Sequence, residues 1–263
     1  MLDSISDFGE KGRMRILILG GTTEASALAR LLSGRSEFSP VLSMAGRTSE
    51  PRPVPVPTRI GGFGGVDGLA CFLLQERIEA VIDATHPFAA VMSRNAAEAC
   101  ARVHVPLLAL RRPPWIPQAG DRWTEVNSME EAVDALGDEP RRVFLTVGRL
   151  ELPPFADAPQ HTYLVRTIEP IGDALPVPNV IAIQDRAPFN EAAERALMER
   201  EQIEVVVTKN SGGAATYPKI VAARALGLPV IVVARPQKLR GVEEVASADA
   251  ALEWLDRYHG RTP

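Results

Sequence analysis

The sequence predicts an α/β protein of two halves, each built around a parallel β-sheet, with a ligand cleft between the halves. Short apolar segments alternate with longer helical stretches along the chain. Several of the apolar segments are β-branched throughout, as is typical of strands covered on both faces. The pattern of elements also repeats faintly between the two halves of the chain. A length of 263 residues suits such a pair of domains.

Nine segments have the character of strands: 15–19, 41–45, 80–84, 106–110, 142–147, 162–166, 180–183, 204–208 and 229–234. Helical patterns occupy 23–32, 66–76, 89–102, 128–136, 188–200, 214–226 and 248–258. This alternation indicates βαβ units. The first strand is followed by a glycine turn and a helix, so we expect both halves to be Rossmann-like.

A faint internal repeat relates the two halves. Thr85 and Thr208 each end a strand, and Pro106 and Pro229 open the next one at the same spacing. An Arg-Pro pair and then a Glu-Val-Xaa-Ser run follow in both halves. A true duplication and the ordinary likeness of α/β units both explain this pattern.

The domain boundary is predicted near residues 136–140. We expect a cofactor-binding domain over 14–137 and a second α/β domain over 138–263 that completes the substrate cleft. Residues 1–13 are charged and lack an apolar stretch, so they predict a disordered tail rather than a signal peptide, and Met14 is an alternative start.

Composition restricts the class of function. A net charge of −4 argues against general nucleic-acid binding. The chain has no run close to the ~18 apolar residues that a membrane span needs. Two cysteines suit a reducing, cytoplasmic location. Because His, Cys and carboxylates show no metal-ligand spacing, we expect neither a functional metal nor a flavin.

A glycine turn follows the first strand and opens a helix. Its residues are Gly20, Gly21, Thr22, Thr23 and Glu24. Glycine lets the backbone approach a phosphate, and the helix N-terminus offers N–H donors and a partial positive charge. The run predicts a site for the cofactor diphosphate. The alternative is a plain glycine turn with a threonine N-cap.

Arg47 and Thr48 follow the second strand, where dinucleotide folds meet the adenosine ribose. An acidic residue there selects NAD, whereas arginine accommodates the 2′-phosphate of NADP. The sequence therefore favours NADPH, with an exposed surface arginine as the alternative.

Four glycines surround Phe63 in the run 61–65, directly after Arg59 and Ile60. Such a loop brings backbone close to a ligand, and Phe63 is positioned to cover a ring, so Gly62 and Phe63 are assigned to the cofactor. A simple mobile turn explains the run equally well.

Thr85, His86 and Phe88 lie at the carboxyl end of a predicted central strand, with Ser93 downstream. Open α/β sheets bind ligands at this end of their strands. We assign Thr85 to the cofactor, and His86, Phe88 and Ser93 to the substrate. His86 is also a candidate proton donor, although a lone histidine is usually structural.

The equivalent strand end in the second half carries a lysine and a glycine pair. Lys209, Asn210, Ser211 and Gly213 form a candidate anion nest, and Tyr217 and Lys219 follow. The alternative is a turn with a solvated lysine.

Taken together, these motifs resemble the precorrin-6A reductase family. The likeness extends from about Met14 to about Pro236. The motifs are L-G-G-T-T-E-A at 19–25, G-R-T at 46–48, G-G-F-G-G at 61–65, D-A-T-H-P-F-A at 83–89, L-T-V-G-R at 145–149 and T-K-N-S-G-G at 208–213. The family implies NADPH-dependent reduction of one macrocycle double bond, from precorrin-6A to precorrin-6B, in cobalamin biosynthesis. The G-G-F-G-G block is closer to the metal-free branch than to the cobalt-precorrin-6A reductases of the anaerobic branch.

A precorrin carries many carboxylates, so its site needs several cations. Arg59, Lys209 and Lys219 are assigned to the substrate for this reason. Asn210, Ser211 and Gly213 of the candidate anion nest are assigned to the substrate as well. His86, Lys209 and Tyr217 are the candidate catalytic groups, since a proton must be delivered beside the carbon that accepts hydride. Neighbouring enzymes of the pathway are possible partners. The alternatives from other classes are a non-catalytic NADPH-binding regulator and a sugar-nucleotide enzyme with two Rossmann-like halves.

Overall fold

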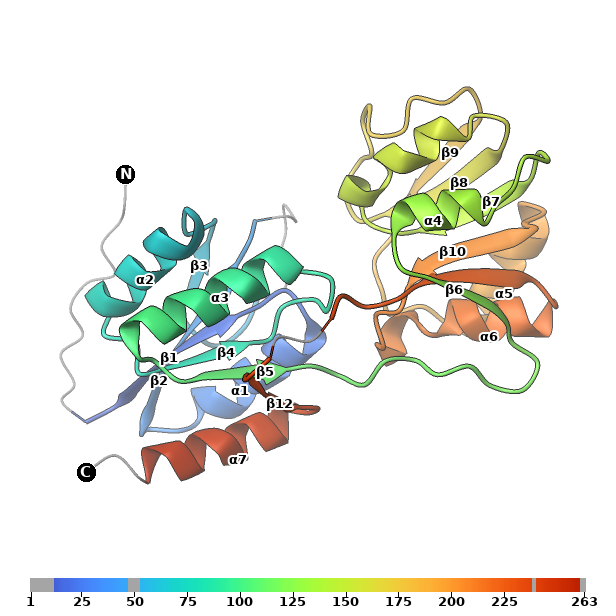
Figure 1. The fold of residues 1–263 in the computed structure, drawn as a ribbon. Helices are drawn as coiled ribbons and strands as arrows, with labels where there is room; N and C mark the ends of the chain where they lie inside the picture. The colour runs from blue at the N-terminus through green and yellow to red at the C-terminus, as the bar shows by residue number, and fades with distance from the viewer. Residues whose placement is uncertain (1–11, 47–52, 238–239, 261–263) are drawn as a thin grey trace. The chain divides into compact units, whose positions relative to one another are not determined.

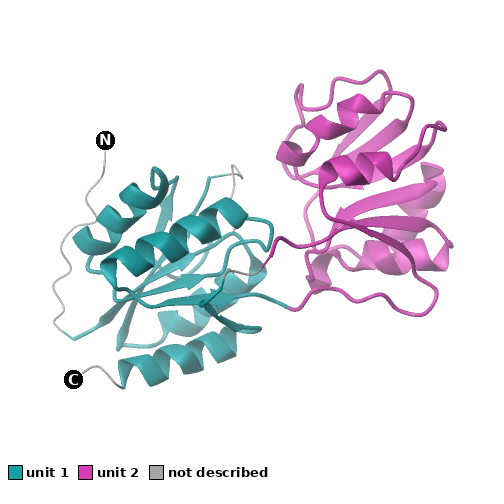
Figure 2. Ribbon diagram, viewed as in Figure 1, with its two compact units in different colours: residues 1–112, 238–263 teal, residues 113–237 magenta. Residues whose placement is uncertain are grey.

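The computed structural model describes residues 12–46, 53–237 and 240–260 (Figure 1). The chain divides into two compact units (Figure 2). Unit 1 comprises Met1–Arg112 and Lys238–Pro263, and unit 2 comprises Pro113–Gln237.

Unit 1 is built on a six-stranded sheet in the order β12-β5-β4-β1-β2-β3, in which every pair is parallel. The strands are β1 (Met14–Leu19), β2 (Phe38–Met44), β3 (Thr58–Ile60), β4 (Ala80–Asp83), β5 (Leu107–Leu110) and β12 (Glu243–Val245). The central strands β1 and β4 are buried almost throughout, which explains why their sequences are apolar except for Arg15 and Asp83.

Two helices cover each face of this sheet (Figure 1). They are α1 (Thr23–Ser33) and α7 (Ala248–His259) on one face, and α2 (Gly65–Gln75) and α3 (Ala90–Val103) on the other. The core beneath α1 and α7 contains Leu28, Leu32, Trp254 and Leu255.

Unit 2 has the same design, with strand order β6-β11-β10-β7-β8-β9 and only parallel pairs among its described strands. The strands are β6 (Arg122–Val126), β7 (Arg142–Thr146), β8 (Thr162–Thr167), β9 (Val180–Gln184), β10 (Val205–Lys209) and β11 (Pro229–Val233). Its helices are α4 (Met129–Asp134), α5 (Glu191–Arg200) and α6 (Pro218–Ala225), with short 3₁₀ turns η1 (Arg149–Glu151), η2 (Pro153–Asp157) and η3 (Ala214–Thr216).

The two units exchange their last strand and helix. β6 and α4 follow the first five strands of unit 1 in sequence but belong to unit 2, where β6 pairs with β11. Conversely, β12 and α7 follow unit 2 in sequence but complete unit 1, where β12 pairs with β5. The repeat matches this exchange, because Ser128 and Ser247 are the N-caps of α4 and α7.

The exchange corrects the predicted domain boundary. The predicted domains 14–137 and 138–263 place β6 and α4 in the first domain and α7 in the second. The chain instead crosses between the units after Arg112 and again after Gln237. The predicted tail 1–13 lies outside the described residues except for its last two positions.

Each of the nine predicted strands and seven predicted helices corresponds to an observed element. The sequence missed β3, β6 and β12. These strands lie at or beside a sheet edge and are mostly polar or exposed, so they lack the apolar run that marks the central strands. Within the described part of the chain, every helix is too short or too polar to cross a bilayer.

Candidate active site

In unit 1, the loops after β1 and β4 begin side by side. The register pairs Leu19 at the end of β1 with Asp83 at the end of β4. The chain continues from β1 toward β2 on one side and from β4 toward β5 on the other. This divergence is the switch point at which open α/β sheets bind ligands, and it joins the loops 20–24 and 84–89.

The loop after β1 uses its two glycines differently. Gly20 packs against β2, since a Cβ there would lie 2.6 Å from Leu42 Cδ1. Gly21 has a φ of +114° and open space where a Cβ would stand. A left-handed residue with an open face at the start of α1 fits the backbone cradle that a phosphate group needs.

Thr22 connects the two loops of unit 1. Its hydroxyl accepts a hydrogen bond from Ala25 N at 3.1 Å, which makes it the N-cap of α1. The same hydroxyl donates to Ala84 O at 2.8 Å, after β4. Thr23 Oγ1 donates to Glu24 Oε2 at 3.1 Å, and Glu24 forms an ion pair with Arg112 at 2.7 Å. Thr22 therefore has a structural role whether or not a phosphate binds.

Asp83 organises the loop after β4. Its side chain is almost fully buried and accepts hydrogen bonds from Thr85 N at 3.1 Å and from Thr85 Oγ1 at 2.7 Å. Arg111 pairs with the other carboxylate oxygen and donates to Ser93 Oγ at 2.8 Å. Ser93, predicted as a substrate residue, thus lies on a buried network that holds the loop. Asp83 was not assigned as a site residue, although it opens the quoted D-A-T-H-P-F-A motif.

His86 and Phe88 are half-buried in that loop. His86 Nδ1 accepts from Phe88 N at 3.3 Å, and the two rings are 5.8 Å apart. A neutral imidazole whose Nδ1 accepts carries its proton on Nε2. This geometry suits a hydrogen-bond donor at Nε2, and transfer of a proton from the ring requires the imidazolium form.

The glycine-rich loop 61–65 holds Phe63 against its own unit. The Phe63 ring lies 5.1 Å from that of Phe72, and the Arg59 guanidinium stacks on Phe63 at 4.0 Å. Arg59 also donates to Ser43 Oγ, Gly61 O and Gly62 O. Its pKa is lowered by burial. Arg59 thus organises this loop, while its predicted contact with substrate stays a prediction. Arg47 and Thr48 lie outside the described residues.

In unit 2, the loop after β10 binds the chain that enters from unit 1. Asn210 accepts from Trp115 N at 2.8 Å and donates to Trp115 O at 2.9 Å. Arg235 donates to Pro113 O at 3.1 Å and to Ser211 O at 3.0 Å. Gly212 has a φ of +72°, and a Cβ there would lie 2.0 Å from Pro113 O. Part of the T-K-N-S-G-G motif is therefore structural, which the spacing alone did not reveal.

Lys209 lies at the end of β10 and forms an ion pair with Glu151 at 2.6 Å. Its neighbour Ser211 is buried, and Ser211 Oγ lies 3.3 Å from Thr216 Oγ1. Gly213, also buried, has an ordinary extended backbone. Glu151 was missed in the sequence because it follows a different strand, β7.

Lys219 and Tyr217 lie where α6 begins. Lys219 is 3% exposed and donates to Thr216 O at 3.0 Å, so the structure places it in the interior of unit 2. The Tyr217 hydroxyl accepts from Arg224 at 2.9 Å, and Arg224 in turn pairs with Asp121. Direct contact of either residue with substrate stays a prediction.

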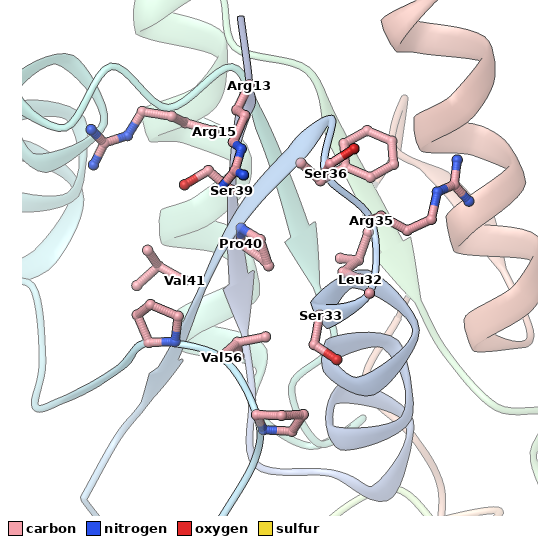
Figure 3. A pocket seen from close by; sticks show the side chains of 14 residues that line it. Arg13, Arg15, Leu32, Ser33, Arg35, Ser36, Ser39, Pro40, Val41 and Val56 are labelled. Carbon is pink, nitrogen blue, oxygen red and sulfur yellow. The ribbon is translucent and has the colours of Figure 1, made fainter. Parts of the chain in front are cut away.

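A cavity of about 490 Å³ lies elsewhere in unit 1, at the amino ends of β1 and β2 (Figure 3). Arg13, Arg15, Arg35 and Ser39 are among the residues that line it. This is the opposite edge of the sheet from the switch point. None of the predicted site residues is among its lining residues, so we assign it no part in the candidate site.

The described residues contain no group of three His, Cys, Asp or Glu side chains that could hold a metal ion. Most of the predicted site residues that the structure describes lie at or just after the carboxyl ends of strands. Arg59 lies within β3, and Ser93 and Lys219 lie in α3 and α6. The cleft shared by the two units stays a prediction.

Comparison with known proteins identifies the family. The model of the family "Precorrin-6x reductase CbiJ/CobK" matches residues 15–256. The chain belongs to this family. A precorrin-6A reductase from Sinorhizobium sp. is 54% identical, with 97% of this chain and 99% of that protein covered. A cobalt-precorrin-6A reductase from Priestia megaterium is 31% identical, with 84% and 91% covered.

A solved structure described as "CobK precorrin-6A reductase" superposes with a TM-score of 0.89 and 49% identity, covering 95% of this chain and 98% of that one. The comparison confirms the predicted Rossmann-like α/β fold and the predicted family. Membership of a reductase family makes the chain an oxidoreductase.

Proposed function

We propose that the chain reduces precorrin-6A to precorrin-6B with NADPH, as a step of cobalamin biosynthesis. The observation that carries the proposal is the family match over residues 15–256, joined to a cofactor-type glycine loop at the switch point of unit 1. Identity of 54% to a metal-free precorrin-6A reductase, against 31% to a cobalt-precorrin-6A reductase, favours the metal-free substrate.

Unit 1 is the proposed NADPH site. The open face at Gly21 and the N-terminus of α1 would hold the diphosphate, and Thr85 lies on the adjoining loop. Arg47 and Thr48 would receive the 2′-phosphate. The bound cofactor supplies a hydride. The chain's own task is to orient the nicotinamide and to keep the reacting carbon within reach.

The loops at the carboxyl ends of β7 and β10 are proposed to hold the anionic macrocycle. Lys209 offers a cation at this edge, and the exposed Arg149 follows β7. Arginine pairs carboxylates bidentately, which fixes orientation as well as charge. The proton is delivered through Nε2 of His86 in its imidazolium form, with Tyr217 and Lys209 as the alternative donors.

The reaction is placed in the cytoplasm, in keeping with two free cysteines, Cys71 and Cys100. Neighbouring enzymes of the pathway remain proposed partners, because they supply the substrate and receive the product.

The test is to incubate the purified protein with NADPH and precorrin-6A and to monitor the absorption of NADPH and of the macrocycle. We expect macrocycle-dependent oxidation of NADPH, with a slower reaction for NADH and for cobalt-precorrin-6A. NADPH binding without turnover would instead support the regulator. Faster turnover of cobalt-precorrin-6A than of precorrin-6A would assign the protein to the anaerobic branch of the pathway.

A further inference from the structure

Unit 2 has its own switch point, at β7 and β10. The register pairs Thr146 of β7 with Thr208 of β10, one residue before Lys209. The chain continues from β7 to β8 and from β10 to β11, on opposite sides of this pair. The loops 147–151 and 210–216 therefore diverge here as the loops 20–24 and 84–89 do in unit 1, and a ligand of unit 2 is expected at this point.

An ion pair spans the two strands at this point. Lys209 Nζ donates to Glu151 Oε1 at 2.6 Å, with the two side chains 13% and 27% exposed. Glu151 reaches the lysine by folding back over Gly148, where a Cβ would stand 2.4 Å from Glu151 Oε2. Glycine at this position leaves the space that the carboxylate occupies.

The turn that carries Glu151 also presents surface suited to a large anion. Leu150 is 66% exposed and Arg149 is exposed. Ile168, 46% exposed, follows the neighbouring strand β8. Arg149 Nη1 lies 3.5 Å from Pro170 O, which links the loops after β7 and β8. Apolar area beside cations is what a flat macrocycle with carboxylate arms requires.

We propose that Glu151 is a specificity-determining residue. Its carboxylate pairs with Lys209 in the free enzyme, and a substrate carboxylate takes its place on the lysine when the substrate binds. This inference rests on the proposed function, since it takes the ligand to be a polycarboxylate. Binding exchanges one carboxylate for another on the same lysine, so the chemistry of the contact is preserved. Because the lysine has a carboxylate partner before and after the exchange, its largely buried charge is never left unpaired.

Such an exchange favours ligands that carry several carboxylates over ligands that carry one. A small monocarboxylate gains nothing over Glu151, which is already tethered beside the lysine at a high effective concentration. A macrocycle with several carboxylates gains further contacts, for example with Arg149, and apolar contact with Leu150. Glu151 therefore disfavours single anions and permits the substrate.

The test compares Glu151→Gln, Lys209→Met and the double variant with the wild-type enzyme. The readouts are steady-state kinetics and a direct absorption titration of precorrin-6A without NADPH. We expect Glu151→Gln to lower Kd and KM about 3- to 10-fold and to increase inhibition by a simple monocarboxylate such as acetate. Lys209→Met should raise Kd about 10-fold, and the double variant should match it, because the competitor has no effect once its lysine is gone.

Glu199→Gln is the matched control, because it removes a surface ion pair with Arg195, in which both side chains are 51% exposed. It should bind the macrocycle as wild type does. If wild type binds precorrin-6A but Glu151→Gln binds it equally or more weakly, the inference is wrong and the proposed function stands. If wild type neither binds nor reduces precorrin-6A, the proposed function fails, and the inference fails with it.

Discussion

Lys219 lies inside unit 2 among other charged side chains. It is 3% exposed, 5.1 Å from the Trp115 ring, and close to the buried ion pair of Arg166 with Glu194. Burial, reinforced by Arg166 and opposed by Glu194, lowers the pKa of Lys219 to about 7. The folded protein therefore favours the neutral amine, whereas the unfolded chain keeps an ordinary lysine.

This pKa makes stability depend on pH. Below about pH 7 the amine is charged in both states, and its burial costs the folded state in full. Between about pH 7 and the ordinary lysine pKa the unfolded chain binds more protons, so the free energy of unfolding rises with pH. We expect Lys219→Met to be more stable than wild type at pH 6.5, and this advantage to shrink by roughly 2–3 kcal/mol by pH 9. Denaturant titrations of both proteins at both pH values check this. The same difference in free energy of unfolding at pH 6.5 and pH 9 would contradict it.

Arg47 carries the prediction of cofactor choice. Arg47→Ala removes the proposed charged partner of the 2′-phosphate, so it should weaken NADPH binding by about 1–3 kcal/mol and spare NADH. Calorimetric titration of both cofactors measures the difference. An equal loss for the two would place Arg47 away from the 2′-phosphate.

For single residues, the sequence predicted where the candidate site residues lie better than it predicted what each side chain contacts. The motifs led to both switch points. They did not show that Asn210 pairs with the Trp115 backbone or that Thr22 bonds Ala84, because these partners are far apart in sequence. Glu151 was missed for the same reason, since β7 and β10 become neighbours only in the sheet.

Among the elements, the loop after β10 depends on one glycine. Gly212→Ala would place a Cβ 2.0 Å from Pro113 O and 2.2 Å from Arg235 Nη2, at a φ of +72°. Gly137→Ala is the matched control, because Gly137 has a φ of +76° and open space around it. The control should cost about 1–2 kcal/mol of backbone strain, and Gly212→Ala at least ~2 kcal/mol more. Chemical denaturation of both variants tests this, and equal losses would remove the close approach as the cause.

The elements themselves were predictable where burial imposes a pattern. Strands such as β1 and β10 are apolar because helices cover both faces. β12 has the sequence Glu-Glu-Val and is mostly exposed, so it forms because β5 offers it an open edge. A strand of this kind is decided by its neighbour rather than by its own residues.

For the whole molecule, the decisive feature is the exchange of β6 with α4 for β12 with α7. Local pattern predicts the elements but not the sheet that each one joins, and this is why the predicted boundary near 137 was wrong. An Arg-Pro pair lies at each crossing point. The first crossing falls between Arg112 and Pro113, and the second comes just after Arg235-Pro236. The preceding strands β5 and β11 end three residues before each proline, at Leu110 and Val233, and the chain then passes to the other unit.

The exchange predicts which fragments fold. Residues 113–237 are contiguous and contain all six strands of the second sheet, so this fragment should fold alone. Residues 12–112 lack β12 and α7, which leaves the β5 edge open and removes Ala251, Trp254 and Leu255 from the core. Loss of two large apolar side chains alone costs roughly 4–6 kcal/mol, comparable with the net stability of a domain.

We therefore expect fragment 12–112 to be unfolded by circular dichroism and to show no cooperative thermal transition. Joining it to 238–260 through a flexible linker of about ten glycine and serine residues should restore folding, since that segment supplies the missing strand and helix. A Trp254→Ala change in the joined fragment should remove most of the gain, because Trp254 packs in the core between α7 and the sheet and donates to Glu243 at 2.9 Å. Cooperative folding of 12–112 without α7 would show that β12 and α7 are dispensable for the folding of unit 1.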